Sequence, residues 1–156
     1  MRIEFLSHAG TGYSMMTTEQ LEEIGVPPAV IAAAAGTIII AAAHDQVRAI
    51  GAALYTRDPV QAAIYEAKFS EAQRYVAAGK PANVSAADYP FLSAEAPVRG
   101  LTKGALADLI IATGNPWLAF AAQMEAARAR ISADVAAAAT IPAKQAAADA
   151  VIASLT

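Results

Sequence analysis

Apolar positions recur at intervals of three and four along most of this chain, and this period is typical of helices that pack along one face. Such stripes predict helices over 37–55 and 59–79, and a short helix from Pro90 that Pro97 and Gly100 close. Beyond these we expect a helix from Lys103 to Thr113 that Gly114 ends, a long helix from Asn115-Pro116, and a last helix from Thr140-Pro142. The predicted fold class is therefore mainly α, built from antiparallel helical hairpins or a bundle.

The first sixteen residues follow a different pattern. Ile3, Phe5 and Tyr13 flank the turn-rich stretch Ser7–Gly12, which predicts a short β-hairpin. Thr17-Thr18-Glu19-Gln20 then fits a capping box, and Gly25 ends the helix that it starts. We therefore divide the chain into a hairpin or attachment segment, 1–16, and an alanine-rich helical domain, 17–156.

Alanine shapes the expected core, because it accounts for 43 of the 156 residues. Each buried alanine methyl contributes only ~0.8 kcal/mol, so we expect close helix contacts and a shallow core. The core anchors that we expect are Tyr65, Phe69, Trp117, Phe120 and Met124. We also expect that the helices need a partner, or further copies of the chain as a homo-oligomer, to finish burying their faces. Tyr89-Pro90-Phe91-Leu92 is expected to fold over the helices as a lid, with an exposed docking ridge as the alternative.

Uncharged residues run from Gly25 to Ala43, which is long enough on paper for a membrane span. Pro27-Pro28 open this run, Gly36-Thr37 divide it, and alanine gains little from lipid. We therefore expect a second short segment from Pro27-Pro28 and no membrane partner. No export signal is expected either, since three acids precede the apolar run.

The candidate chemistry is sparse. The chain has no cysteine and two histidines: His8 is expected as an exposed turn residue, and His44 with Asp45 as a solvated helix pair. We therefore expect no metal, no cofactor and no enzymatic activity. A net charge of −3 argues against binding nucleic acid, and Arg128 and Arg130 have acids one helical turn away, Glu125 and Asp134.

From Asp58 onward the order of residues resembles an alanine-rich helical cassette of predicted tail proteins from tailed bacteriophages and prophages, often encoded near tail-fibre genes. About 95 of the 156 residues are involved. The motifs that carry the resemblance are Asp58-Pro59-Val60-Gln61, Tyr65 with Lys68, Glu71-Ala72, Tyr75, Tyr89-Pro90, Leu92, Ala94-Glu95-Ala96, Gly100-Leu101-Thr102, Leu109-Ile110-Ile111, Trp117, Glu125-Ala126 and Arg128. The N-terminal segment is also similar, more weakly, to the openings of small tail-fibre assembly proteins.

The resemblance implies a place in a virion rather than a reaction. We expect a non-enzymatic structural component of the phage tail, made in the host cytoplasm, that acts as an adaptor to a tail-fibre or baseplate protein. The alternatives are an assembly chaperone of the fibre that is not retained in the virion and, outside this family, a small holin-like membrane protein. For an adaptor, we expect the partner to contact the hairpin through Ile3, Phe5, Leu6 and Tyr13, because short apolar strands can add to the edge of a partner's sheet.

Overall fold

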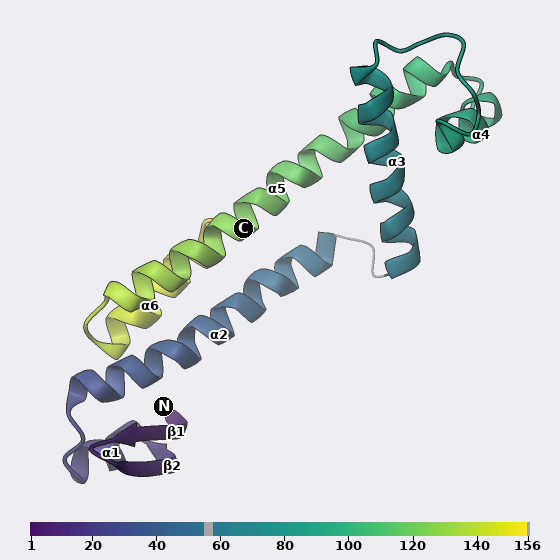
Figure 1. The fold of residues 1–156 in the computed structure, drawn as a ribbon. Helices are drawn as coiled ribbons and strands as arrows, with labels where there is room; N and C mark the ends of the chain where they lie inside the picture. The colour runs from purple at the N-terminus through teal and green to yellow at the C-terminus, as the bar shows by residue number, and fades with distance from the viewer. Residues whose placement is uncertain (55–57, 156) are drawn as a thin grey trace. The chain divides into compact units, whose positions relative to one another are not determined.

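The computed structural model describes residues 1–54 and 58–155 (Figure 1). This part of the chain is mainly α-helical with a two-stranded antiparallel hairpin at its N-terminus, so the predicted fold class is confirmed. Its elements are β1 (Arg2–His8), β2 (Thr11–Thr17), α1 (Thr18–Glu23), α2 (Pro28–Leu54), α3 (Pro59–Ala77), α4 (Pro90–Val98), α5 (Lys103–Ala137) and α6 (Ile141–Ala153).

The chain forms two compact units. Unit 1 combines Met1–Ala53 with Gln123–Thr156, and unit 2 comprises Leu54–Ala122. Helix α5 begins in unit 2 and ends in unit 1.

The hairpin of unit 1 follows its turn chemistry. Ala9 and Gly10 form a two-residue loop with φ angles of 50° and 80°, which is the signature of a type I′ turn. The predicted capping box is confirmed: Gln20 N donates to Thr17 Oγ1 at 3.3 Å, and Thr17 N donates to Gln20 Oε1 at 2.9 Å. A small cluster then joins the strands to α1 and the start of α2, and its buried members are Ile3, Leu6, Leu21, Val26 and Ile31.

Helix α2 is one helix of 27 residues, so the predicted division at Gly36-Thr37 is wrong. Gly36 is buried in this helix, and a Cβ there would lie 3.4 Å from Cδ of Lys144 in α6. Lys144 is itself buried, and its Nζ donates to the carbonyl of Val135 at 2.5 Å, near the C-terminus of α5. This glycine therefore provides room for a buried lysine, and the lysine interacts favourably with the negative end of α5.

The second core of unit 1 lies among α2, the C-terminal part of α5, and α6, which Figure 1 shows lying along α5. Its buried members are Ile39, Ala43, Val47, Ala127, Ile131, Val135, Ala148 and Val151. His44 is half-buried beside this core, where its Nε2 lies 3.1 Å from the carbonyl oxygen of Arg128 and 3.3 Å from Ser132 Oγ. The expectation of a solvated His44 is therefore wrong, because the ring bridges α2 to α5.

Unit 2 is built by α3, α4 and the first part of α5. Helix α3 starts at Pro59, as the sequence predicts, and Asp58 caps it by accepting from the amides of Val60 and Gln61. Tyr89 and Leu92 are buried, so the predicted lid is confirmed. The buried members of this core are Ala72, Tyr75, Tyr89, Leu92, Ala96, Leu106 and Ala107.

Helix α5 also continues where a break was predicted. Its 35 residues include Gly114 and Pro116, so the predicted stop and restart at 114–116 are wrong. Gly114 is a packing position instead, because the ring of Phe69 occupies the space that a Cβ would fill. Pro116 removes one backbone hydrogen bond and leaves the carbonyl of Ala112, an exposed residue, without its usual donor.

The short connection between the predicted helices 37–55 and 59–79 includes Thr56-Arg57, which lie outside the described residues, so the antiparallel pairing of these helices stays a prediction. Two described helices are long and apolar enough to cross a membrane by length and composition: Pro28–Ala53 and Lys103–Ala137. Buried residues make up 39% of the apolar window in the first and 11% in the second. The core helix of a soluble protein passes the same test.

Candidate functional site

Unit 2 has an apolar groove on its surface. It has a volume of about 560 Å³ and lies among α3, α4 and α5. The lining residues are Tyr65, Lys68, Phe69, Glu95, Arg99, Leu106, Leu109, Ile110, Thr113, Gly114 and Trp117. This volume is within the usual range of ligand sites.

The aromatic part of the groove depends on the glycine in α5. Phe69 of α3 lies directly against Gly114, so α3 and α5 approach closely at this level. Trp117 lies one turn further along α5 and contacts Phe120, with ring centroids 6.0 Å apart. Helical spacing therefore brings an aromatic ring of each helix to the same groove.

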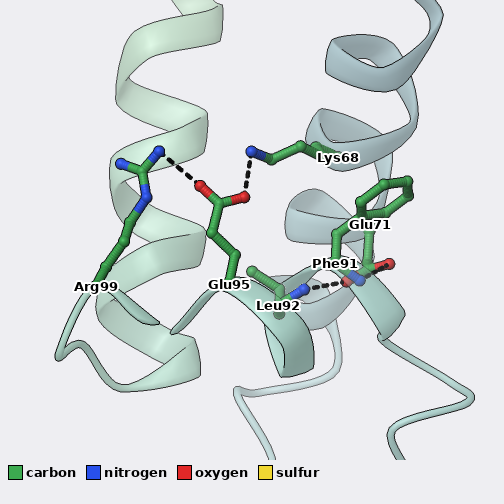
Figure 2. Close-up of polar contacts among 6 residues, drawn as sticks. All are labelled: Lys68, Glu71, Phe91, Leu92, Glu95 and Arg99. Atoms are coloured by element: carbon green, nitrogen blue, oxygen red, sulfur yellow. Dashed lines mark hydrogen bonds and ion pairs between the residues drawn. The ribbon is translucent and has the colours of Figure 1, made fainter. Parts of the chain in front are cut away.

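A charged cluster forms the rim (Figure 2). The carboxylate of Glu95 pairs with Lys68 of α3 through one oxygen and with Arg99, at the end of α4, through the other at 2.6 Å. The hydrogen bond from Lys68 and the charges of both cations lower the pKa of Glu95, against the opposing effect of burial. Glu95 is thus held ionised, and two cations face a single carboxylate.

A second carboxylate fixes α4 on α3. Glu71 is buried, and its two oxygens accept from the backbone amides of Phe91 at 3.2 Å and Leu92 at 2.7 Å (Figure 2). The N-cap residue of α4, Tyr89, makes no side-chain cap hydrogen bond. Glu71 therefore caps α4 from a neighbouring helix, at the end where the helix dipole favours a negative charge.

Tyrosines and an arginine hold the loop that leads into α4. The rings of Tyr75 and Tyr89 meet edge to face with centroids 5.0 Å apart, and the guanidinium of Arg74 lies 5.4 Å from the centroid of Tyr89. Tyr75 Oη donates to the carbonyl of Pro81 at 3.0 Å, and Arg74 donates to that of Asp88 at 2.9 Å. These contacts place α4, and with it Glu95 and Arg99, at the rim of the groove.

The groove brings together three of the five expected core anchors, but on its surface rather than in a core. Tyr65 is 51% exposed at the rim, whereas Phe69 and Trp117 are half-buried. Phe120 is half-buried beside Trp117, and Met124 packs against the core of unit 1. The largest fully buried side chains are aliphatic instead: Leu21, Ile31, Leu92, Leu106, Ile131, Val47 and Val135.

The expected partner contacts of the hairpin divide between its two faces. Ile3 and Leu6 are buried against α1 and α2, so these two side chains fasten the hairpin and are not displayed to a partner. Phe5 is 69% exposed, and Tyr13 is half-buried. The reason is a local irregularity: Glu4 and Met15 are not paired and Met15 has a φ of 56°, which lets residues three apart in β1 face the same core.

Reasoning from the pattern missed four residues that form or position the rim of the groove: Lys68, Glu71, Glu95 and Arg99. Their only signal was the resemblance, whose motifs include the first three of them. Among the described residues, no group of three or more His, Asp or Glu side chains is placed to hold a metal ion. The groove combines an apolar floor with the carboxylate of Glu95, which Lys68 and Arg99 already neutralise. A surface of this kind is suited to binding an apolar group.

No protein-family model, curated protein or solved structure matches this chain.

Proposed function

We propose that the protein is a non-enzymatic structural component of a phage tail, an adaptor that sits beside the tail fibre or baseplate in the virion. The resemblance of residues 58–156 supports this proposal, because its motifs include the residues that assemble unit 2. Among them are the capping carboxylate Glu71, the lid residues Tyr89 and Leu92, and the rim pair Lys68 and Glu95.

The attachment role is supported by the N-terminal hairpin, because one of its faces is buried and the other is exposed. Ile3 and Leu6 anchor one side, while Phe5 is exposed and the two-stranded sheet has no third strand among the described residues. An anchored hairpin with open edges can add a strand to a partner's sheet without unfolding its own domain. We therefore place the fibre contact at Phe5 and the strand edges, with Tyr13 beside them.

Binding to the fibre tests this contact. Phe5→Ser should weaken capture of the purified fibre or baseplate protein at least about tenfold, with unchanged helicity by circular dichroism. Ile24→Ser is the matched control, since Ile24 is exposed in the same unit but outside the hairpin. Deleting residues 1–16 is a poor test, because it also removes Ile3 and Leu6 from the core. Unchanged capture by the Phe5 variant would move the contact away from the hairpin.

Mass spectrometry of purified particles separates the two roles within this proposal. A virion component should be present at a fixed ratio to the fibre. A chaperone should bind newly made fibre in the lysate and be absent from particles, and that result would refute our first choice.

The two long apolar helices favour a second candidate, the small holin-like membrane protein. The apolar window of α5 is only 11% buried, so the described structure does not cover it. Carbonate extraction of the producing cells decides this question: a product that stays in the membrane pellet supports the candidate, and a fully extracted one excludes it.

A further inference from the structure

The two-residue turn of the hairpin determines which of its backbone groups are left without a partner. In a β-turn the carbonyl of the first residue accepts from the amide of the fourth, so His8 and Thr11 form a hydrogen-bonded pair. Along an antiparallel ladder, such pairs alternate with pairs whose amides and carbonyls point away from the partner strand. The pairs of this second kind in the regular part of the hairpin are Ser7 with Gly12 and Phe5 with Ser14.

The burial of the side chains agrees with this alternation. Phe5 and Ser7 are exposed, whereas Leu6 between them is buried. A Cβ on Gly12 would lie 3.4 Å from the ring of Phe5, so the ring lies over β2 on the exposed face. The ring therefore does not cover the outer edge of β1, where the amides and carbonyls of Phe5 and Ser7 point.

The two outer edges of the hairpin are not equivalent. Met15 has a φ of 56°, and its carbonyl accepts from Nε of Arg2 at 3.1 Å, so the extended backbone of β2 is interrupted. Strand β2 also leads directly into α1, which lies against it. Strand β1 has no residue of positive φ, and among the described residues no backbone hydrogen bond outside the ladder involves it. The edge of β1 is thus the more continuous and the more open of the two.

We infer that the tail partner contributes an extended strand that pairs with the outer edge of β1 at Phe5 and Ser7, an inference that rests on the proposed tail function. These two residues present amide donors and carbonyl acceptors two positions apart along one edge. Another strand at a spacing of ~4.8 Å matches this pattern group for group. The added segment converts the hairpin into a three-stranded sheet, in which main-chain hydrogen bonds supply the affinity.

A matched pair of proline substitutions distinguishes the two edges. Proline has no amide hydrogen and is tolerated at strand positions whose amide is not used in the ladder, so Ser7→Pro and Ser14→Pro both leave the hydrogen bonds of the hairpin in place. Ser7→Pro should weaken capture of the purified fibre or baseplate protein at least about tenfold. Ser14→Pro should change it no more than about twofold, as should Ser7→Ala, which keeps the amide.

Amide hydrogen exchange of the unsubstituted chain gives a second measurement that does not depend on how the hairpin tolerates proline. In the free chain the amides of Phe5 and Ser7 should exchange rapidly, because they face solvent. On binding of the fibre or baseplate protein, their exchange should slow at least about tenfold. The amides of Gly12 and Ser14 on the other edge should keep their rates.

The outcomes separate this inference from the proposed function. A chain that captures neither protein would refute both together. Capture that survives Ser7→Pro, with unchanged exchange at Phe5 and Ser7, would refute strand addition to β1 and leave the adaptor role standing. Protection at Gly12 and Ser14 instead would assign the contact to β2 and also refute it. Protection of Phe5 and Ser7 in the concentrated chain alone would assign this edge to a second copy, against the inference.

Discussion

Truncating the buried carboxylate of Glu71 gives the sharpest test of how unit 2 holds together. Glu71 accepts two hydrogen bonds from the first turn of α4, and a hydrogen bond to a charged group contributes ~1.5–3 kcal/mol. In Glu71→Ala, the amide of Leu92 stays buried without an acceptor and the helix loses its cap. We expect the free energy of unfolding to fall by about 2–4 kcal/mol, a large fraction of the stability of a domain of this size.

The smaller change Glu71→Gln keeps one carbonyl oxygen. It can still accept from Leu92, but its NH₂ group would face the amide donor of Phe91, so we expect an intermediate loss of ~1–2 kcal/mol. Urea unfolding followed by Trp117 emission reports on unit 2 directly, and hydrogen exchange at the amides of Phe91 and Leu92 reports on the cap itself. Glu66→Ala is the matched control, because Glu66 is an exposed carboxylate on the same helix. A loss below ~0.5 kcal/mol with unchanged protection of Leu92 would refute the capping role.

Three further changes have defined outcomes. Gly114→Ala should lower the free energy of unfolding by ~1–3 kcal/mol, because the new methyl meets the ring of Phe69. In the control Gly104→Ala the methyl makes only ordinary contacts, so the free energy of unfolding should be unchanged or rise by up to ~1 kcal/mol. Urea midpoints compare the two variants, and equal effects would contradict the packing role of Gly114. Ala9→Asn should raise the free energy of unfolding by ~0.5 kcal/mol and the melting temperature with it, because asparagine tolerates the left-handed conformation of this turn. An unchanged melting temperature would mean that the backbone of Ala9 is not strained. Because the pKa of Glu95 is lowered, the ionised carboxylate stabilises the fold at pH values above the ordinary pKa of 4.5, and this stabilisation is lost as the pH falls through the lowered pKa. Glu95→Gln should therefore flatten the dependence of the urea midpoint on pH between 6 and 3. Parallel curves for the two proteins would contradict this expectation.

Local signals predicted much of the fold because their physics acts over a few residues. The N-terminal hairpin, the capping box at Thr17 and the helix start at Pro59 each depend on residues close in sequence. The helix breaks predicted at Gly36 and Gly114 were wrong, because each glycine lies inside a helix and makes room for a side chain of another helix. Gly36 makes room for Lys144, and Gly114 makes room for Phe69. A single sequence does not reveal such long-range contacts.

The site was harder to predict than the fold. Aromatic residues were expected to dominate the interior, but aliphatic side chains such as Leu92 and Leu106 fill the cores, and Tyr65 lies at the surface. Glu71 and Glu95 looked like ordinary helix-surface acids, since nothing in their spacing shows that α4 folds back onto α3. The amides that Glu71 caps lie 20 and 21 residues away along the chain, and Glu95 reaches back to Lys68 on another helix.

The order of units along the chain has a consequence for synthesis on the ribosome. Unit 2 is continuous and can fold as soon as it emerges, but unit 1 needs Gln123–Thr156 to complete its second core. Translation of the intervening residues takes about 3–14 s at ordinary bacterial rates. During that interval Ile39 and Val47 have no helix to pack against. A nascent chain stalled near residue 120 should therefore recruit general chaperones to α2. A chain stalled only after residue 156 has left the ribosome should release them.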